Sequence, residues 1–237
     1  MNTTFQKKYG ISAAVLKYIA VATMLVDHFA LAVYRQTQGY NPAVYHAMRK
    51  IGRIAFPIYC FLLVEGFFHT KNVSKYIRNC FLFAVISEIP FNMAVFGKVI
   101  YPNGQNVYST LTIGLCALVI LDRFRYHYKI NNILLQMIVI GSSALLGELL
   151  EVDYHWKGVL FIIMFYYIRN MQKPIQMIVG ICAFAYEVTA PLALIPIHLY
   201  NGLRGKQRKY LFYAIYPVHL LIFGLIRLYL NGTLYLN

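Results

Sequence analysis

Charged residues are scarce in this sequence: they make up 13% of its 237 residues, about half the share in soluble proteins. Acids are scarcer still, with 8 Asp and Glu against 22 Lys and Arg. The mean hydropathy is +0.55, and several apolar stretches approach or exceed the roughly 20 residues that cross a bilayer. These features exclude a water-soluble fold. They predict an all-α polytopic membrane protein, a bundle of about 8–9 transmembrane or re-entrant helices that forms one integral-membrane domain over residues 1–237.

The common sequence motifs of nucleotide-binding proteins, hydrolases and zinc proteases are missing as well. Phosphate-binding loops, dinucleotide fingerprints, nucleophile elbows and zinc-protease helices do not occur. The 4 cysteines fall in apolar runs at spacings that suit neither a disulfide framework nor a zinc site, so we expect no metal. The cations are scattered through short loops without a basic face. We therefore expect them to set topology and contact anionic lipid rather than nucleic acid.

The first apolar span, about residues 11–34, nevertheless carries three ionisable groups: Lys17, Asp27 and His28. Lys17 and His28 lie eleven positions apart, so in a helix their side chains share nearly one stripe, about 16 Å apart along the axis. Asp27 points about a quarter-turn away. Ionisable groups at membrane depth usually face a protein interior or a polar cavity and mark functional sites. The alternative is a buried ion pair or hydrogen bond that only locks helices together.

Polar residues also occur in the later spans. The second, about residues 51–68, has Arg53 near its start and Glu65 near its end, and Arg49 precedes it. His69 follows Glu65 by four residues and shares its helical face. The third span, about residues 77–97, contains Glu88 just before Pro90, where a proline can kink a helix and shape a pocket. The last, about residues 210–230, contains Tyr216 and His219.

Further spans are expected at about residues 107–121, 132–150 and 157–168, the last too short to cross alone. Residues 174–200 are ambiguous, because Glu187, Pro191 and Pro196 interrupt them. The loop cations offer a test, since cytoplasmic loops carry an excess of Lys and Arg.

If residues 174–200 cross once, ten cations lie on the N-terminal side: Lys7, Lys8, Lys71, Lys75, Arg78, Arg123, Arg125, Lys129, Arg169 and Lys173. Nine then lie opposite: Arg35, Arg49, Lys50, Lys98, Lys157, Arg204, Lys206, Arg208 and Lys209. If the segment enters and returns, the last four change sides and the split becomes fourteen to five. The charges thus favour a broken or re-entrant element, with the N-terminus in the cytoplasm and the protein in the inner, or cytoplasmic, membrane.

A neutral histidine in a polar pocket suits general-base work near pH 7. It could deprotonate an amine or hydroxyl that attacks a carbonyl, while Lys17, Arg49 and Arg53 hold phosphates or stabilise developing negative charge. His69 and His219 are candidates for the same pocket. The residues alone indicate a membrane protein with an intramembrane polar site, and a proton-coupled transporter fits them nearly as well.

Several separated motifs, in order along nearly the whole chain, resemble the TraX family, named for the membrane protein that acetylates the N-terminus of F-type conjugative pilin. The motifs in this sequence are Leu16-Lys17-x-Ile19-Ala20-x-x-x-Met24-x-x-Asp27-His28, Ile51-Gly52-Arg53-Ile54-Ala55-Phe56-Pro57-Ile58, Glu65-Gly66-Phe67-x-His69-Thr70-Lys71-Asn72, Ile86-Ser87-Glu88-Ile89-Pro90-Phe91, Asn106-Val107-Tyr108-Ser109-Thr110-Leu111, Leu199-Tyr200-Asn201-Gly202-x-x-Gly205 and Lys209-Tyr210-Leu211-Phe212-Tyr213-Ala214-Ile215-Tyr216-Pro217-Val218-His219-Leu220.

That family resembles a wider set of membrane acyltransferases, which includes the acyltransferase-three proteins and heparan-glucosaminide N-acetyltransferase. Many acyltransferase-three proteins have a basic residue, ten intervening positions and a histidine in their first span. Lys17 and His28 fit this spacing, although the basic residue there is usually arginine.

The resemblance implies an acetyltransferase that uses acetyl-CoA as cosubstrate and an amine or hydroxyl acceptor, such as a peptide or pilin N-terminus or a glycan. It makes His28 the expected catalytic residue, with Lys17 as a partner. From the residues themselves we expect Asp27 to aid His28, and Lys17, Arg49 and Arg53 to bind acetyl-CoA. The expected substrate pocket comprises Glu65, His69, Glu88, Asn201, Tyr216 and His219. The alternative is a proton-coupled transporter or flippase that uses Asp27, His28, Glu65 and Glu88 as a relay.

Overall fold

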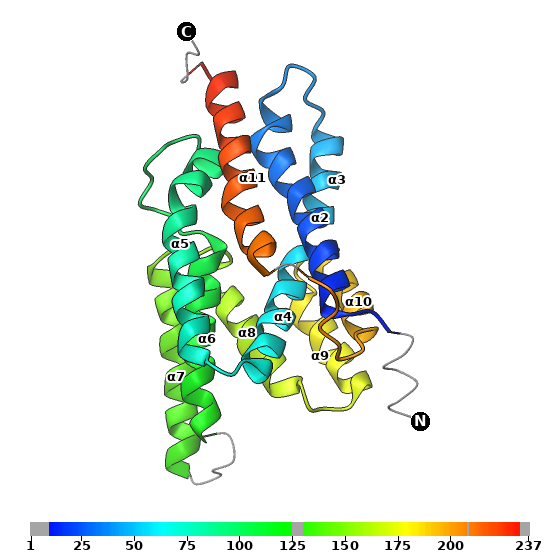
Figure 1. Ribbon diagram of the computed structural model, residues 1–237, viewed down its shortest axis with the longest axis vertical. Helices are drawn as coiled ribbons and strands as arrows, with labels where there is room; N and C mark the ends of the chain where they lie inside the picture. Colours follow the sequence, from blue (N-terminus) through cyan, green and yellow to red (C-terminus); the bar gives the residue numbers. More distant parts are fainter. Residues whose placement is uncertain (1–9, 125–129, 208, 233–237) are drawn as a thin grey trace. The chain divides into compact units, whose positions relative to one another are not determined.

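The computed structural model describes residues 10–124, 130–207 and 209–232, which form helices and loops with no β-strand in these ranges. The helical elements (Figure 1) are α2 (Ala13–Ala32), η1 (Tyr34–Gln36), α3 (Pro42–Gly52), α4 (Ala55–His69), α5 (Val73–Phe96), α6 (Val107–Phe124), α7 (Ile130–Leu149), α8 (His155–Ile168), α9 (Lys173–Phe184), η2 (Ala190–Ala193), α10 (Leu194–His198) and α11 (Lys209–Leu230).

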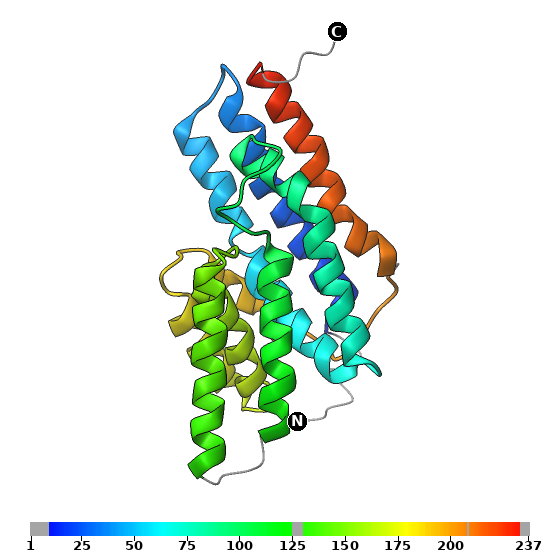
Figure 2. The same ribbon diagram turned by 90° about the vertical axis from the view of Figure 1, so that its left-hand side faces the viewer.

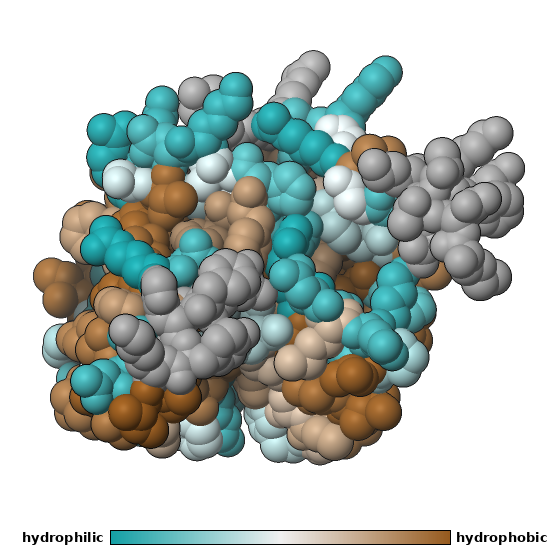
Figure 3. All heavy atoms as spheres, turned by 90° about the horizontal axis from the view of Figure 1, so that it is seen from below, coloured by the Kyte–Doolittle hydropathy of each residue, from teal (hydrophilic) through white to brown (hydrophobic). Residues whose placement is uncertain are grey.

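Six helical segments among the described residues are long and apolar enough to cross a membrane. They are Ala13–Gln36, Pro42–His69, Val73–Phe96, Val107–Phe124, Ile130–Leu149 and Leu211–Leu230, while α8 and α9 are shorter apolar helices. Many of their large apolar side chains are exposed, including Phe81, Val85, Met137 and Ile178. Brown apolar patches accordingly reach the surface in Figure 3. Lipid is the solvent that such a surface fits, and the prediction of an all-α polytopic membrane protein is confirmed.

The second span begins earlier than the sequence pattern suggested. The prediction started it near residue 51, whereas α3 begins at Pro42. Asn41 caps this helix, because its side-chain Oδ1 accepts from the backbone N–H of Ala43 at 2.9 Å and proline occupies the first turn. Asparagine followed by proline is a helix start signal. A short break at residues 53 and 54 separates α3 from α4.

Residues 174–200 are broken, as the loop charges indicated. Helix α9 ends at Phe184, and η2 and the short α10 follow. The side chain of Lys173, at the start of the segment, donates to the backbone carbonyl of His198, at its end, at 3.2 Å. The two ends of the segment therefore lie together, which is the geometry of an element that enters and returns. Five cations of the charge comparison lie outside the described residues: Lys7, Lys8, Arg125, Lys129 and Arg208.

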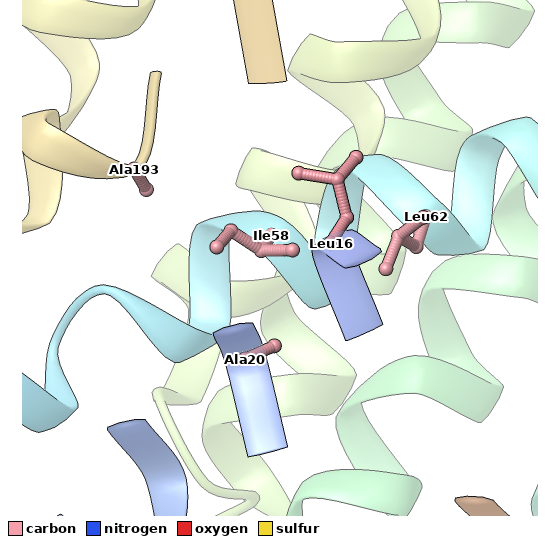
Figure 4. Close-up of a cluster of buried hydrophobic side chains, with 5 residues drawn as sticks. All are labelled: Leu16, Ala20, Ile58, Leu62 and Ala193. Carbon is pink, nitrogen blue, oxygen red and sulfur yellow. The ribbon is translucent and has the colours of Figure 1, made fainter. Parts of the chain in front are cut away.

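The residues form two compact units, and α4 and α5 each continue from one into the other. Unit 1 comprises residues 1–62, 89–100 and 172–237. Helix α2 contacts both α3 and α11 in this unit. A core cluster joins α2 to the first half of α4 and to η2 (Figure 4), and its members are Leu16, Ala20, Ile58, Leu62 and Ala193. Because one face of α2 is buried in this way, its neighbouring faces are fixed toward α3 and α11.

Unit 2 comprises residues 63–88 and 101–171. Helices α6, α7 and α8 pack pairwise there, and α6 and α7 run side by side in Figure 2. Asn106 is fully buried just before α6. Its side-chain amide donates to the carbonyl of Ala84 and to Oε2 of Glu88, both at 2.7 Å. Asn106 thereby ties the start of α6 to α5, and continuous helix carries α5 through Pro90 to Phe96.

Candidate active site on the first and last spans

The centre of the candidate site is a contact between two histidines of unit 1. Nδ1 of His28 on α2 lies 2.7 Å from Nε2 of His219 on α11, and the two ring planes are within 6° of each other. Tyr216, one turn before His219, packs edge-on against both rings, with centroid distances of 6.1 Å and 5.7 Å. His219 is buried at 7% exposure, whereas His28 is half-buried. His28 is thus the less buried ring of the pair.

The hydrogen bonds assign the protons of this pair. Nδ1 of His219 lies 2.6 Å from the backbone carbonyl of Ile215, one turn earlier on α11. A carbonyl oxygen only accepts, so this Nδ1 carries the proton and, in the neutral ring, Nε2 of His219 is an acceptor. Nδ1 of His28 must then donate to it. The neutral His28 ring is left with its lone pair on Nε2, which has no hydrogen-bond partner in the described residues.

The register of α2 against α11 explains why these histidines meet. Tyr18 contacts Phe212, and Phe29 contacts Phe223. Because residue numbers rise together on both helices, α2 and α11 run parallel with their N-terminal ends at the same level. The stripe of α2 that bears His28 therefore faces α11, with contacts near Tyr18 and near His28.

The contact between the His28 stripe of α2 and the facing side of α11 is called the seam below. Lys17 lies at its start. Its Nζ donates to Oε1 of Gln207 at 2.6 Å and lies 5.4 Å from the ring centroid of Phe212. The loop that precedes α11 is hydrogen-bonded to the start of α2. The N–H of Ala13 donates to the carbonyl of Leu203 in this loop at 2.8 Å. The side chain of Asn201 donates to the carbonyl of Gly10 at 2.8 Å. Asn201 thus fixes the chain near Lys17 rather than the histidine pair.

Asp27 points from α2 toward α3, a quarter-turn from His28. Its Oδ2 accepts from Nη1 of Arg49 at 2.6 Å, and both side chains are largely buried. Oδ1 of Asp27 is buried without a hydrogen-bond partner in the described residues. Gly52 makes this approach possible, because a Cβ there would overlap the side chain of Asp27. Asp27 is thus paired with Arg49, in the last turn of α3.

Arg53 has a different acidic neighbour. Its Nε lies 3.9 Å from Oε1 of Glu187, in the loop after α9. Burial and the adjacent Glu187 carboxylate raise the pKa of Tyr186 to about 12, so its phenol is neutral at physiological pH. Oγ1 of Thr189 donates to the carbonyl of Lys50, so the same loop is bonded to the end of α3. Arg49 thus forms an ion pair with Asp27, and Arg53 lies beside Glu187.

The remaining predicted pocket residues belong to unit 2 and take their partners there. Glu65 accepts from Nε of Arg169 at 2.6 Å, and the Arg169 guanidinium lies 4.4 Å from the ring centroid of Phe68. His69 donates from Nδ1 to the backbone carbonyl of Glu65 at 2.7 Å and is mostly exposed. Glu88 accepts from Asn106. These contacts hold unit 2 together, and none of them involves the histidine pair.

Sequence reasoning missed two residues that position these groups. Arg169 follows the apolar run of α8, a position at which the sequence predicts only a loop cation. Gly52 falls in a motif, yet the need for a missing Cβ appears only when α3 lies against Asp27. Among the described residues, no group of three or more His, Cys, Asp or Glu side chains could hold a metal ion.

The fold and this seam define a class: a polytopic helical membrane protein with a partly accessible histidine pair between its first and last spans. The chain belongs to the TraX protein family, whose model matches residues 12–227. It is 29% identical to a probable fimbrial assembly protein FimC, serogroup H1, of Dichelobacter nodosus, over 95% of this chain and 99% of that protein. No solved structure matches the chain.

Proposed function

We propose that the protein is an acetyl-CoA-dependent membrane acetyltransferase with His28 as general base. The observation that carries this proposal is the proton order in the histidine pair, which leaves Nε2 of the half-buried His28 ring as a hydrogen-bond acceptor without a partner in the described residues. A base must lie within hydrogen-bond reach of the proton it removes and be unprotonated there. The family match supports the proposal, since the resemblance that the sequence bears to TraX implies acetyl transfer.

The reaction follows from this arrangement. Nε2 of His28 takes the proton from an acceptor amine or hydroxyl as its nitrogen or oxygen bonds to the thioester carbon. The carbon–sulfur bond then breaks, and His28 passes this proton to the sulfur of CoA, which leaves as the thiol. Nδ1 of His28 stays bonded to His219 throughout, so the ring keeps its orientation while its charge changes.

The charged groups of unit 1 suggest how acetyl-CoA approaches. Arg204 and Lys206 lie in the loop bonded to the start of α2, at the end that bears Lys17. Lys173 also bonds to the end of the returning segment. Arg204, Lys206 and Lys173 thus belong to one end of unit 1, and we place this end in the cytoplasm because cytoplasmic loops carry an excess of Lys and Arg. CoA phosphates would meet Lys17 there, whereas Arg49 and Arg53 serve mainly to hold Asp27 and Glu187.

The acceptor belongs to the same proposal. The relative from Dichelobacter nodosus is described as a fimbrial assembly protein. This favours the N-terminal amine of a pilin among the acceptors, with a glycan amine or hydroxyl as the other chemical possibility. For both kinds of acceptor, the attacking group would approach Nε2 of the half-buried His28.

The test is acetyl-CoA binding and thiol release by the full chain purified in detergent. We expect saturable binding, and thiol release that falls about 10²–10⁴-fold in His28→Ala. Lys17→Gln should weaken acetyl-CoA binding while the bound complex still turns over. The matched control is His198→Ala, which removes an exposed histidine of the same unit and should behave like the wild type.

Full activity of folded His28→Ala would overturn the mechanism. If well-folded wild type binds no acetyl-CoA at millimolar concentration, the enzyme proposal is wrong. Substrate movement in proteoliposomes that depends on a proton gradient would then identify a transporter.

A further inference from the structure

The guanidinium of Arg49 is held next to His28 by the residue that precedes it. Asp27 and His28 are neighbours on α2, with Cα atoms about 3.8 Å apart, and Oδ2 of Asp27 accepts from Nη1 of Arg49 at 2.6 Å. Gly52 lets the backbone of α3 come up against Asp27, because a Cβ there would overlap its side chain. Arg49 is therefore one residue and one hydrogen bond away from His28, and the two groups interact electrostatically.

The ion pair with Asp27 uses only one nitrogen of Arg49. Nη1 bonds to Asp27, whereas Nε and Nη2 have no hydrogen-bond partner in the described residues. The side chain keeps 20% of its surface exposed, and neither nitrogen is among the fully buried unpartnered polar atoms. The guanidinium thus keeps N–H donors with exposed surface. Unpartnered donors of a cation within a membrane span are costly, so they indicate a polar ligand.

The ring of His28 turns its lone pair away from α11. Nδ1 points at His219, so Nε2 lies on the opposite edge of the ring. An amine or hydroxyl that loses its proton to Nε2 bonds to the thioester carbon, whose oxygen then becomes negative. Two hydrogen bonds of about 3 Å and the two covalent bonds between them span roughly 8 Å. The group that receives this oxygen must therefore lie close to His28.

The other cations near the site fit this requirement less well. Lys17 lies about 16 Å from His28 along the axis of α2, which is twice that span. Arg53, one turn after Arg49, has its Nε 3.9 Å from the carboxylate of Glu187. Arg49 is thus the cation whose position is tied directly to the neighbour of His28.

We propose that Arg49 is a further catalytic residue, whose N–H donors bind the thioester oxygen as negative charge develops on it, and that Asp27 is its positioning residue. No proton moves to or from Arg49. The carbonyl electron pair shifts to oxygen as the nucleophile bonds to carbon, and it returns as the carbon–sulfur bond breaks. Arginine suits this role because its guanidinium stays charged and its planar fork is held by Asp27. The inference rests on the proposed acetyl transfer and names a second group of that site.

The test separates kcat from acetyl-CoA binding, with thiol release by the full chain in detergent as the assay. Arg49→Gln alone leaves the carboxylate of Asp27 buried and unpaired, which can prevent folding. The decisive variant therefore combines Asp27→Asn with Arg49→Gln, so that an amide pair replaces the ion pair. Asp27→Asn alone retains the guanidinium. The matched control is Lys50→Gln, which removes the exposed cation next to Arg49.

We expect kcat to fall about 10²–10³-fold in the double variant, as for the loss of an oxyanion donor. Asp27→Asn should lower kcat about tenfold through weaker positioning, and Lys50→Gln should stay within about twofold of the wild type. The dissociation constant for acetyl-CoA should stay within about threefold throughout, because the lost contact belongs to the transition state.

Three other results would overturn the proposal. A higher dissociation constant with unchanged kcat would assign Arg49 to the CoA phosphates. Wild-type kcat in a folded double variant would leave Arg49 only a structural ion pair. If the wild type itself releases no thiol, the proposed function fails, and this inference fails with it; the first two results leave His28 and acetyl transfer intact.

A spectroscopic measurement tests the contact without turnover. Acetyl-CoA with a carbon isotope at the thioester carbonyl is bound to His28→Ala, and the infrared band of that carbonyl is recorded. Hydrogen bonds from Arg49 should polarise the carbonyl and lower its wavenumber. The band should return to higher wavenumber when Asp27→Asn and Arg49→Gln are added. A band that does not move between the two proteins would overturn the assignment of Arg49, even where His28→Ala behaves as the proposed base requires.

Discussion

Replacing His219 with leucine tests the proton order in the histidine pair. The change removes the acceptor for Nδ1 of His28, a hydrogen bond of 2.7 Å at a buried residue. Such a bond between neutral groups contributes about 0.5–1.5 kcal/mol. Without it, His28 can rotate or take the other tautomer, so the productive form is less populated. At about 1.4 kcal/mol per factor of ten, we expect kcat to fall by about two- to tenfold, with the KM for acetyl-CoA nearly unchanged.

His219→Gln is the informative comparison, because its amide oxygen can still accept from His28. We expect it to retain most of the activity that His219→Leu loses. The assay is thiol release from acetyl-CoA, with His198→Leu as the control for the same chemical change at an exposed site. The reasoning is refuted if His219→Leu matches the wild type, or if the leucine and glutamine variants are equally impaired. A loss as large as that of His28→Ala would instead make His219 a direct participant.

The remaining predictions concern stability, measured by thermal unfolding in detergent. Gly52→Ala should lower the free energy of unfolding by about 1–3 kcal/mol, since its Cβ would overlap Asp27. Gly141→Ala, where a Cβ meets nothing within 4 Å, should leave stability unchanged or raise it by up to about 1 kcal/mol; equal effects of the two would contradict the contact. Arg169→Gln should cost about 3 kcal/mol, because Glu65 loses a partner at 2.6 Å. An unshifted midpoint would show that this ion pair is not a structural contact.

The sequence was enough to predict which residues share a face of α2. Helical periodicity alone placed Lys17 and His28 on one face and Asp27 a quarter-turn away. The structure gives these faces different neighbours: α11 meets Lys17 and His28, and α3 meets Asp27. Position on a helix is a local property, so periodicity captures it. The break in residues 174–200 was predicted differently: prolines and an acid made the segment ambiguous, and the distribution of the loop cations favoured a break.

The partners across helices were not predictable in the same way. Periodicity cannot distinguish Arg49 from Arg53 as the partner of Asp27, since the choice depends on a backbone approach that Gly52 permits. Glu65 and Arg169 are separated by 104 positions, and no local pattern links them. His219 was one of several candidate histidines until the parallel register of α2 and α11 placed it against His28.

The long separation within the seam has a consequence for biogenesis. Lys17 and Gln207 are 190 positions apart, and His28 and His219 are 191 apart. At roughly 5–20 residues per second, the ribosome needs on the order of 10–40 s to deliver the last span after the first has entered the bilayer. During that interval the first span carries a lysine and a histidine without their final neighbours. A chain that stops before α11 therefore cannot acquire the site, because His219 and Gln207 come from the last part of the sequence.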